Sequence, residues 1–172
     1  QGIFGGTKIR TRTGISLQKM GAIGKIYEIV FGNESQKFDL TSKIQSTSEL
    51  TKGESHSRGI FAGKSRALIK GQIIVEQGSK NSDTYLTQHG MLLSKDAAAN
   101  AIPCLEIKEQ DVRRATHSAS VAPIDDEHIF YLSSRGLEDS EARKLIVSGF
   151  LLALLKNAAS TTREHIIHHV EE

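Results

Sequence analysis

Polar and apolar residues alternate in short runs along the first two thirds of the chain. Ile26, Glu28 and Val30 would share one face in one run, and Phe38 and Leu40 would do so in the next. A period of two is typical of β-strands with one buried face. No Asn-Gly or Asp-Gly pair is present to form a tight hairpin. The short runs end at glycines, namely Gly24, Gly32, Gly53, Gly63, Gly71, Gly78 and Gly90. We therefore predict a mainly β body built from parallel strands.

The composition narrows the choice of β architecture. Aromatic residues make up 5% of the chain and Trp is absent, which disfavours an immunoglobulin-like sandwich with its buried Trp. Short strands filled with Ile, Val, Leu and Ala suit a solenoid, in which each turn buries its apolar side chains against the next turn. No strict repeat period is visible, so a hexapeptide-repeat acyltransferase is not supported. The composition alone leaves a barrel or a sandwich open as alternatives to the solenoid.

The pattern changes to helical spacing near residue 123. Asp125 and Asp126 would cap a short helix that ends at Gly136. A second helix is predicted to start at Asp139 or Ser140. Its periodic apolar positions are Ala142, Leu145, Ile146, Gly149, Phe150 and Ala153.

The second predicted helix is apolar on nearly every side, because nine of the eleven residues in 145–155 are apolar. A helix of this kind is buried on more than one face, so its second face needs another helix or another chain. Residues 161–172 are predicted to form a last helix. We therefore divide the chain into a β-helix body, residues 1–122, and a C-terminal helical module, residues 123–172.

Charge is unevenly distributed along the 172 residues. The net charge is only +2, which argues against a generic nucleic-acid-binding protein. Residues 1–70 carry 12 basic and 5 acidic side chains, whereas residues 71–172 carry 10 and 15. This asymmetry suits a head-to-tail contact or a charged partner, and a solvated face is the alternative.

The single cysteine, Cys104, excludes an internal disulfide framework and any cysteine-only metal cage within one chain. The longest apolar run, residues 145–155, is about half of what a bilayer span requires. No stretch resembles a signal peptide. The chain begins at Gln1, which suggests a fragment or a processed product. We predict a cytoplasmic protein without a membrane partner.

Seven histidines offer candidate metal ligands. His165, His168 and His169 lie three and four residues apart, so two of them would share a helix face and bind a divalent metal. We favour exposed histidines near a helix end, because the Glu of an HExxH motif is missing from this pattern. His56 and His128 have no nearby partner in the sequence and are interpreted as structural or solvated.

His117 lies among small residues that leave room beside its imidazole. Cys104 lies thirteen residues upstream, a distance that would bring both residues to adjacent turns of a solenoid. Histidine and cysteine suit iron or zinc; a hydrogen-bonded histidine and a buried cysteine are the alternative. No nucleophile elbow, P-loop, dinucleotide fingerprint or CxxC is present, so we predict that the chain is not an enzyme.

Residues 116–151 read THSASVAPIDDEHIFYLSSRGLEDSEARKLIVSGFL, with a His followed by small residues, then a Phe-Tyr-Leu, an Arg-Gly and a Leu-Ile-x-x-Gly-Phe. This run resembles the SufB/SufD family, the scaffold subunits of the Suf iron–sulfur cluster assembly machinery. Similarity covers about residues 53–156 and is strongest over 111–150. Upstream, a Leu-Leu-Ser and an Ile-Pro-x-Leu-Glu-Ile stretch also resemble the core strands of the family. The matching residues are His117, Ile124, Asp126, Glu127, Phe130, Tyr131, Leu132, Arg135, Gly136, Glu141, Ala142, Leu145, Ile146, Gly149 and Phe150.

The resemblance implies a right-handed parallel β-helix followed by a small helical module. In the family, SufB and SufD pair through their β-helices, each binds a SufC ATPase through its C-terminal helices, and the cluster forms at the subunit interface. His117 corresponds to the functional histidine of SufD. The position of the SufB cysteine falls near Gln88 or His89, where no cysteine is present. Ser118 replaces a SufB glutamate, which favours a SufD-like or a short divergent homologue.

We therefore expect a non-enzymatic scaffold subunit that forms a homodimer or heterodimer and uses ATP only through a SufC-type ATPase. A transient iron–sulfur cluster would be held at the subunit interface, with His117 as metal ligand and His89 and Cys104 nearby. The residues expected to bind the ATPase are Asp139, Glu141, Arg143, Lys144, Leu145, Val147 and Leu151. The alternative for this helix is that it packs on its own β-helix. The rival functions are a right-handed β-helix carbohydrate-active enzyme and a metal-dependent hydrolase that uses the C-terminal histidines.

Overall fold

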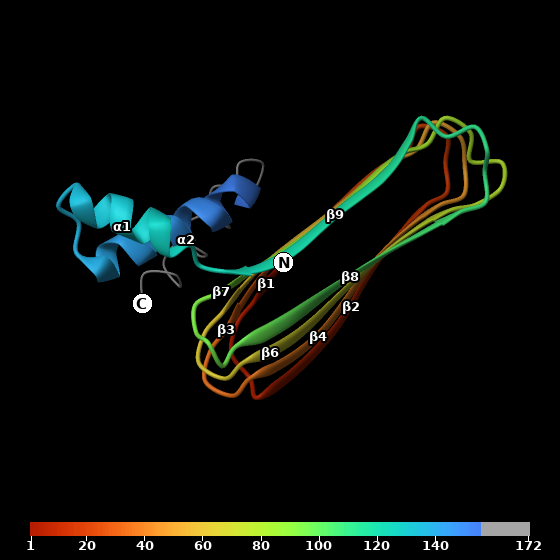
Figure 1. Ribbon diagram of the computed structural model, residues 1–172. Helices are drawn as coiled ribbons and strands as arrows, with labels where there is room; N and C mark the ends of the chain where they lie inside the picture. The colour runs from red at the N-terminus through yellow and green to blue at the C-terminus, as the bar shows by residue number, and fades with distance from the viewer. Residues whose placement is uncertain (156–172) are drawn as a thin grey trace.

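The computed structural model describes residues 1–155, in which nine strands precede two helices (Figure 1). The strands are β1 (Gly2–Ile3), β2 (Lys8–Leu17), β3 (Ile23–Gly32), β4 (Lys37–Ser46), β5 (Lys52–Phe61), β6 (Arg66–Val75), β7 (Asp83–Leu92), β8 (Ala98–Ile107) and β9 (Arg114–Pro123). The helices are α1 (Asp126–Ser134) and α2 (Asp139–Leu155).

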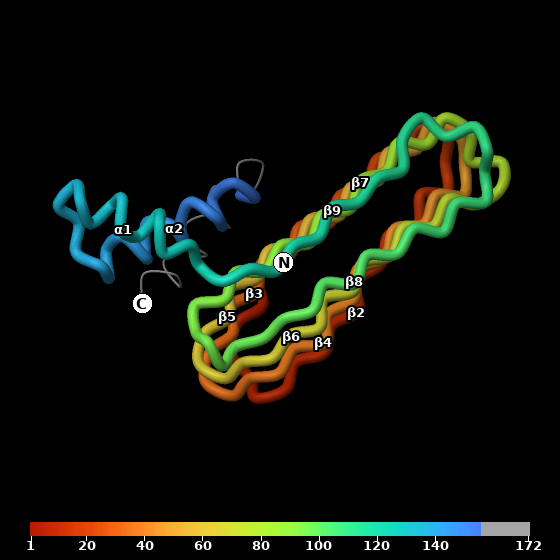
Figure 2. The backbone as a smooth tube through the Cα atoms, viewed as in Figure 1, coloured from red at the N-terminus to blue at the C-terminus, as the bar shows by residue number. Residues whose placement is uncertain are grey.

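The strands form two parallel sheets, with the orders β1-β3-β5-β7-β9 and β2-β4-β6-β8. Each strand therefore pairs with the strand two places further along the chain, and the coils stack as a flattened solenoid of about four turns (Figure 2). Lys8 pairs with Lys37 and Arg66 pairs with Ala98, so the sequence separation of paired residues differs from one coil to the next. The predicted parallel β-solenoid is confirmed, and this variable coil length explains why no strict repeat is visible in the sequence.

The interior of the solenoid follows the predicted alternation. In β4 the residues after Lys37 alternate strictly between buried and half-buried, and Leu40 and Ile44 are fully buried. Ile69 and Ile73 occupy the paired positions of β6 and are equally buried. Each such side chain contributes about 1.5–3 kcal/mol to the free energy of folding through its removal from water.

Gly32 ends β3 as the sequence suggested, but several of the other glycines lie within strands. Gly71 lies in the middle of β6, and Gly53 lies near the start of β5. A Cβ atom at Gly71 would lie 2.5 Å from Leu86 Cδ1, and one at Gly53 would lie 2.7 Å from Ile44 Cγ2. These glycines are therefore needed where side chains of the facing sheet approach the backbone, and the strands run through them for ten residues.

The helices follow directly from β9 and lie to one side of the stacked coils, near the ends of the strands of the five-stranded sheet (Figure 1). Asp125 caps α1 by accepting a hydrogen bond from the backbone N–H of Glu127, and the chain turns at Gly136 with a φ of 94°. No helix in residues 1–155 has the length and apolarity needed to cross a bilayer. The predicted last helix, residues 161–172, lies outside the described residues.

One face of α2 packs on the outside of the five-stranded sheet. Val147 and Leu151 form a buried cluster with Ile29 of β3 and Ile60 of β5. The Arg58 guanidinium donates a hydrogen bond to the backbone carbonyl of α2 at position 150 and lies over the aromatic ring of that residue. One face of α2 therefore packs on its own β-helix, which was the alternative to ATPase binding in the sequence analysis.

Candidate functional site

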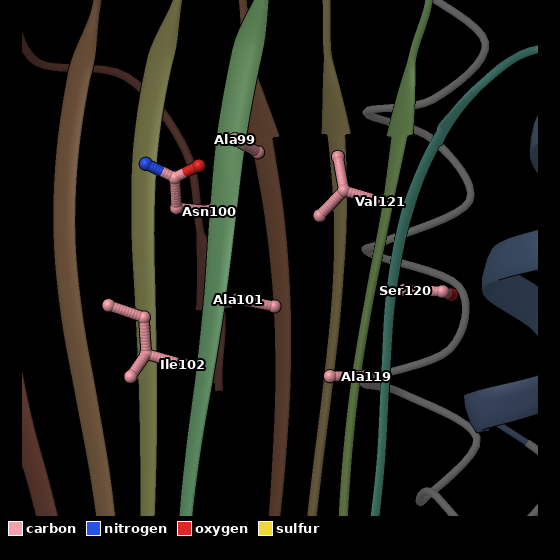
Figure 3. A pocket seen from close by; sticks show the side chains of 7 residues that line it. All are labelled: Ala99, Asn100, Ala101, Ile102, Ala119, Ser120 and Val121. Carbon is pink, nitrogen blue, oxygen red and sulfur yellow. The ribbon is translucent and has the colours of Figure 1, made fainter.

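The solenoid is open at the end formed by its last coil. β8 and β9 are the last strands of their sheets, so each has a neighbour on one side only among the described strands. A cleft of about 390 Å³ lies between them, and in Figure 3 small side chains from both strands point toward one another across it. These inward side chains are Ala99 and Ala101 of β8 and Ala119 and Val121 of β9.

His117 lies on β9 at this open end. It pairs in register with Leu86, which is fully buried in the solenoid, so the register places His117 on the inward side of its strand. His117 is nevertheless exposed, because no described strand continues the sheet beyond β9. The small residues that flank it in the sequence include Ala119, which lines the cleft. The open end thus presents an accessible imidazole beside a cleft lined by small side chains.

His89 lies on the opposite side of the same sheet. It pairs in register with Ser120, and its Nδ1 lies 2.7 Å from the hydroxyl oxygen of that serine. Burial lowers the pKa of His89, and the charge of Arg58 and the proximity of His56 lower it further. Because side chains alternate across a strand, His89 and His117 face different surroundings.

Cys104 lies in the other sheet, on β8, where it pairs with Gln72 and is exposed. The prediction that Cys104 and His117 lie on adjacent turns is wrong, because they occupy the two opposite sheets of the last coil. Within residues 1–155 no three His, Cys, Asp or Glu residues come close enough together to hold a metal ion. A metal site that includes His117 therefore requires ligands from another source.

His56 has partners that the sequence did not reveal. Its Nδ1 lies 2.9 Å from the hydroxyl oxygen of Thr87, its Nε2 lies 3.5 Å from a carboxylate oxygen of Glu54, and its ring stacks on Tyr27. The register of β5 with β7 brings Thr87 beside His56. The number of residues in each coil would be needed to predict that His56 and Thr87 lie side by side. The sequence does not show this number, because it varies between coils. His128 also has a partner, since its Nδ1 lies 3.2 Å from Asp125.

The two half-buried histidines give the chain an expected pH dependence. Burial is the main cause that lowers the pKa of His56 and of His89 below the ordinary 6.5. The unfolded chain therefore binds protons below pH 6.5 that the folded chain does not bind, and we expect the free energy of unfolding to decrease as the pH falls from about 6.5 to about 5. Thermal unfolding followed between about pH 7.5 and about pH 5, a window around the ordinary histidine pKa, measures this decrease.

The double variant His56→Gln/His89→Gln should show a flatter dependence of Tm on pH across this window. His128→Gln is the matched control, because its side chain is 71% exposed and the slope should stay as in the parent chain. Carboxyl groups with lowered pKa values, such as Glu54, affect stability only near and below pH 4.5, which is a separate window. An unchanged slope in the double variant would contradict the assignment.

The seven residues predicted to bind an ATPase divide into two groups. Asp139, Glu141, Lys144 and Leu145 are exposed, and Arg143 is half-buried and pairs with Asp139 at 2.8 Å. Val147 and Leu151 are buried against the solenoid and do not lie on the surface of the module.

Three further apolar residues that the helices expose were not predicted to bind a partner, namely Phe130, Tyr131 and Leu152. Phe130 and Tyr131 lie on α1, and Phe130 is 76% exposed. Together with Leu145 they form the exposed apolar surface of the helices. The histidines at 165, 168 and 169 lie outside the described residues.

Comparison with known proteins places this fold in a family. Residues 1–150 match the family model described as "SUF system FeS cluster assembly, SufBD core domain". The chain is 29% identical over 136 residues to a chloroplastic iron–sulfur cluster assembly SufBD family protein of Arabidopsis thaliana, covering 79% of this chain and 24% of the relative. It is 29% identical over 152 residues to the iron–sulfur cluster assembly protein SufD of Escherichia coli, covering 88% and 36%.

A SufBD family protein of Mycobacterium tuberculosis is 24% identical over 177 residues, covering 98% of this chain and 45% of the relative. The chain thus spans between about a quarter and just under half of the length of these relatives. The parallel solenoid and the match over nearly its whole described length lead to one conclusion: the chain belongs to the SufBD core domain family of the SUF iron–sulfur cluster assembly system.

Proposed function

We propose that the chain is a non-enzymatic scaffold subunit of a Suf-type iron–sulfur cluster assembly complex. It pairs with a second subunit of the SufB/SufD family through the open end of its solenoid. It binds a SufC-type ATPase on its helices and uses ATP only through that ATPase. Family membership supports the role in cluster assembly, and the single cysteine is consistent with the reducing cytoplasm as its compartment. The Arabidopsis relative is described as chloroplastic.

The observation that carries the proposal is the open end with His117. Within residues 1–155 no strand pairs with the outer edges of β8 and β9, so the backbone N–H and C=O groups there are a template for pairing with another chain. Ile107 of β8 is 38% exposed and Val121 of β9 is half-buried in the cleft, so this end also offers apolar surface to a partner. A second solenoid stacked there would bury both the edges and the apolar side chains.

The cluster is the cargo of this site and not a resident group. Iron–sulfur clusters commonly take about four protein ligands, and this chain offers His117 at the open end. The remaining ligands would come from the partner subunit, so that neither chain holds the cluster alone. Gln88, near the position that the resemblance assigns to the SufB cysteine, is fully buried and is not a thiol, which supports a SufD-like role. In this arrangement Cys104 and His89 lie outside the cleft.

The helices supply the proposed docking surface for the ATPase. Phe130 of α1 and Leu145 of α2 are proposed as its main apolar contacts, because they are exposed by 76% and 54%. Asp139, Glu141 and Lys144 form its polar rim. Movement of the helices driven by the ATPase would then open or close the interface at the end of the solenoid as a rigid-body change.

Co-purification with a SufC-type ATPase tests the docking proposal. We expect Phe130→Asp/Leu145→Asp to weaken binding at least about tenfold, because a charge replaces each of the two main apolar contacts. Met20→Asp is the matched control, because Met20 is 67% exposed and lies in the loop before β3. Strands β3 and β9 run parallel in one sheet, so the start of β3 and the end of β9, where α1 follows, lie at opposite ends of the strands. Full retention of the ATPase by the double variant would refute docking on this surface.

The rival functions receive less support. A carbohydrate-active β-helix enzyme is not favoured by membership of the SufBD family. A hydrolase built on the C-terminal histidines would use residues outside the described part of the chain.

A further inference from the structure

The outer face of the sheet β2-β4-β6-β8 carries a row of stacked cations. Lys8 pairs in register with Lys37, and Lys37 pairs with Arg66. All three side chains are exposed, and adjacent strands of a sheet lie about 4.8 Å apart. We call Lys8, Lys37 and Arg66 the basic ladder.

The described part of the chain does not neutralise the basic ladder. Within residues 1–155 no ion pair or side-chain hydrogen bond engages its three cationic groups. Like charges directly opposite one another in a sheet are destabilising. The fold therefore maintains an unfavourable arrangement that an external anion would relieve.

A second group of cations lies beside the ladder. Asp39 forms ion pairs with Arg10 at 3.0 Å, with Arg12 at 3.6 Å and with Lys70 at 3.5 Å. One carboxylate thus serves three cations, and two positive charges remain in excess. Much of the excess positive charge of residues 1–70 therefore lies on the outer face of this sheet, and β9 belongs to the other sheet.

The face also offers apolar surface between the charges. Leu68 of β6 is half-buried and Ile102 of β8 is 49% exposed, and both belong to the outward side of this sheet. A shallow cleft of about 200 Å³ runs beside Lys37 and Arg66 and has Leu68 in its wall. Cations alternating with aliphatic side chains match a ligand that is both acidic and amphipathic.

We propose that this face binds an acidic amphipathic helix of a partner protein. Carboxylates at positions i, i+3 and i+4 of a helix lie about 5–6 Å apart, close to the spacing of the ladder cations. A helix lying across the strands would pair its acidic side with the ladder and its apolar side with Leu68 and Ile102.

A nucleic acid fits this face less well. The outward positions of β2, β4, β6 and β8 hold no aromatic side chain on which a base would stack. The net charge of the whole chain, +2, is also small for a partner of a polyanion.

Fluorescence anisotropy with a labelled peptide tests the proposal on the full chain. The probe is a helical peptide of about 20 residues with Glu at i and i+4 and Leu on one side, titrated at about 0.15 M salt. We expect the triple variant Lys8→Gln/Lys37→Gln/Arg66→Gln to bind it about tenfold more weakly, since three exposed ion pairs are lost and each one contributes modestly in water.

The control variant Lys19→Gln/Lys52→Gln/Lys64→Gln removes the same net charge from three other exposed positions, and it should weaken binding by less than about threefold. Equal weakening by both variants, or no binding of the peptide to the parent chain, would overturn the proposal. Equally tight, ladder-dependent binding of oligothymidylate would overturn it in favour of a polyanion. A homodimer that only the ladder variant loses, without peptide binding, would overturn it in favour of a second copy of the chain.

Discussion

Replacing Leu151 with aspartate is expected to detach α2 from the solenoid. Leu151 is 2% exposed and packs with Ile29, Ile60 and Val147. Removing a buried leucine side chain costs about 2–5 kcal/mol, and a buried carboxylate without a partner adds to this cost. We therefore expect the packing of the helices to lose at least about 3 kcal/mol. Thermal unfolding and protease cleavage between β9 and α1 measure the loss.

Leu152→Asp is the matched control for this prediction. Leu152 is the next residue on the same helix but is 38% exposed, so its replacement should change the free energy of unfolding by about 0.5 kcal/mol or less. The clusters inside the solenoid, around Val30 and Ile73, contain no residue of α1 or α2, so the β-sheet circular dichroism signal should persist in both variants. Equal stability of the two variants would contradict the packing of α2 on β3 and β5.

The same pair of residues shows what the sequence can say about α2. Its caps and its apolar spacing predict the helix. Because the helix is apolar on nearly every side, the pattern does not indicate which face packs on the solenoid. The sequence therefore predicts one docking surface that includes Leu145, Val147 and Leu151. The structure exposes Leu145 and buries the other two residues. Which face turns inward is decided by Ile29 and Ile60, which lie far upstream on β3 and β5 and leave no local signal.

The parallel strands are predictable because their information is local, whereas the solenoid is chosen over a barrel or a sandwich by the resemblance to the SufB/SufD family. Alternation over each strand and the lack of hairpin turns are enough to indicate parallel strands. The length of the strands is not predictable in this way, because Gly53 and Gly71 look like strand ends in the sequence. They are strand residues, required by the close approach of Ile44 and Leu86 from the facing sheet. That contact is tertiary, so no local pattern reports it.

The candidate site depends on the register, which the sequence reveals only in part. His117 is identified by its neighbours and by the resemblance to the SufB/SufD family. The sequence predicts His117 and Cys104 on adjacent turns. The segment between them instead carries the chain from one sheet to the other within the last coil. The pair of His89 with Ser120 is likewise a consequence of the register between β7 and β9. Because the number of residues per coil varies, the sequence shows no repeat from which such pairs could be predicted.

Replacing His117 with alanine is expected to abolish or weaken cluster formation while leaving the fold unchanged. The side chain is exposed at the open end, so its removal creates no cavity and should alter Tm by little. The imidazole is available to iron whenever it is neutral, and loss of a ligand lowers metal affinity by about tenfold or more. Iron and sulfide content and the visible absorbance of the complex, reconstituted with a SufB/SufD-family partner and a SufC-type ATPase, measure the effect.

Two matched variants locate the effect of His117→Ala. His128→Ala removes an exposed imidazole from α1 and should leave the iron and sulfide content as in the parent chain. His89→Ala removes the imidazole on the other side of the same sheet, where it is engaged with Ser120. If the cluster forms in the cleft between β8 and β9, only His117→Ala reduces loading, because the cleft lies on the inward side of β9. Unchanged loading in His117→Ala, with dimerisation intact, would leave His117 as an ordinary surface histidine, and a loss in His89→Ala alone would move the site to the outer face of the five-stranded sheet.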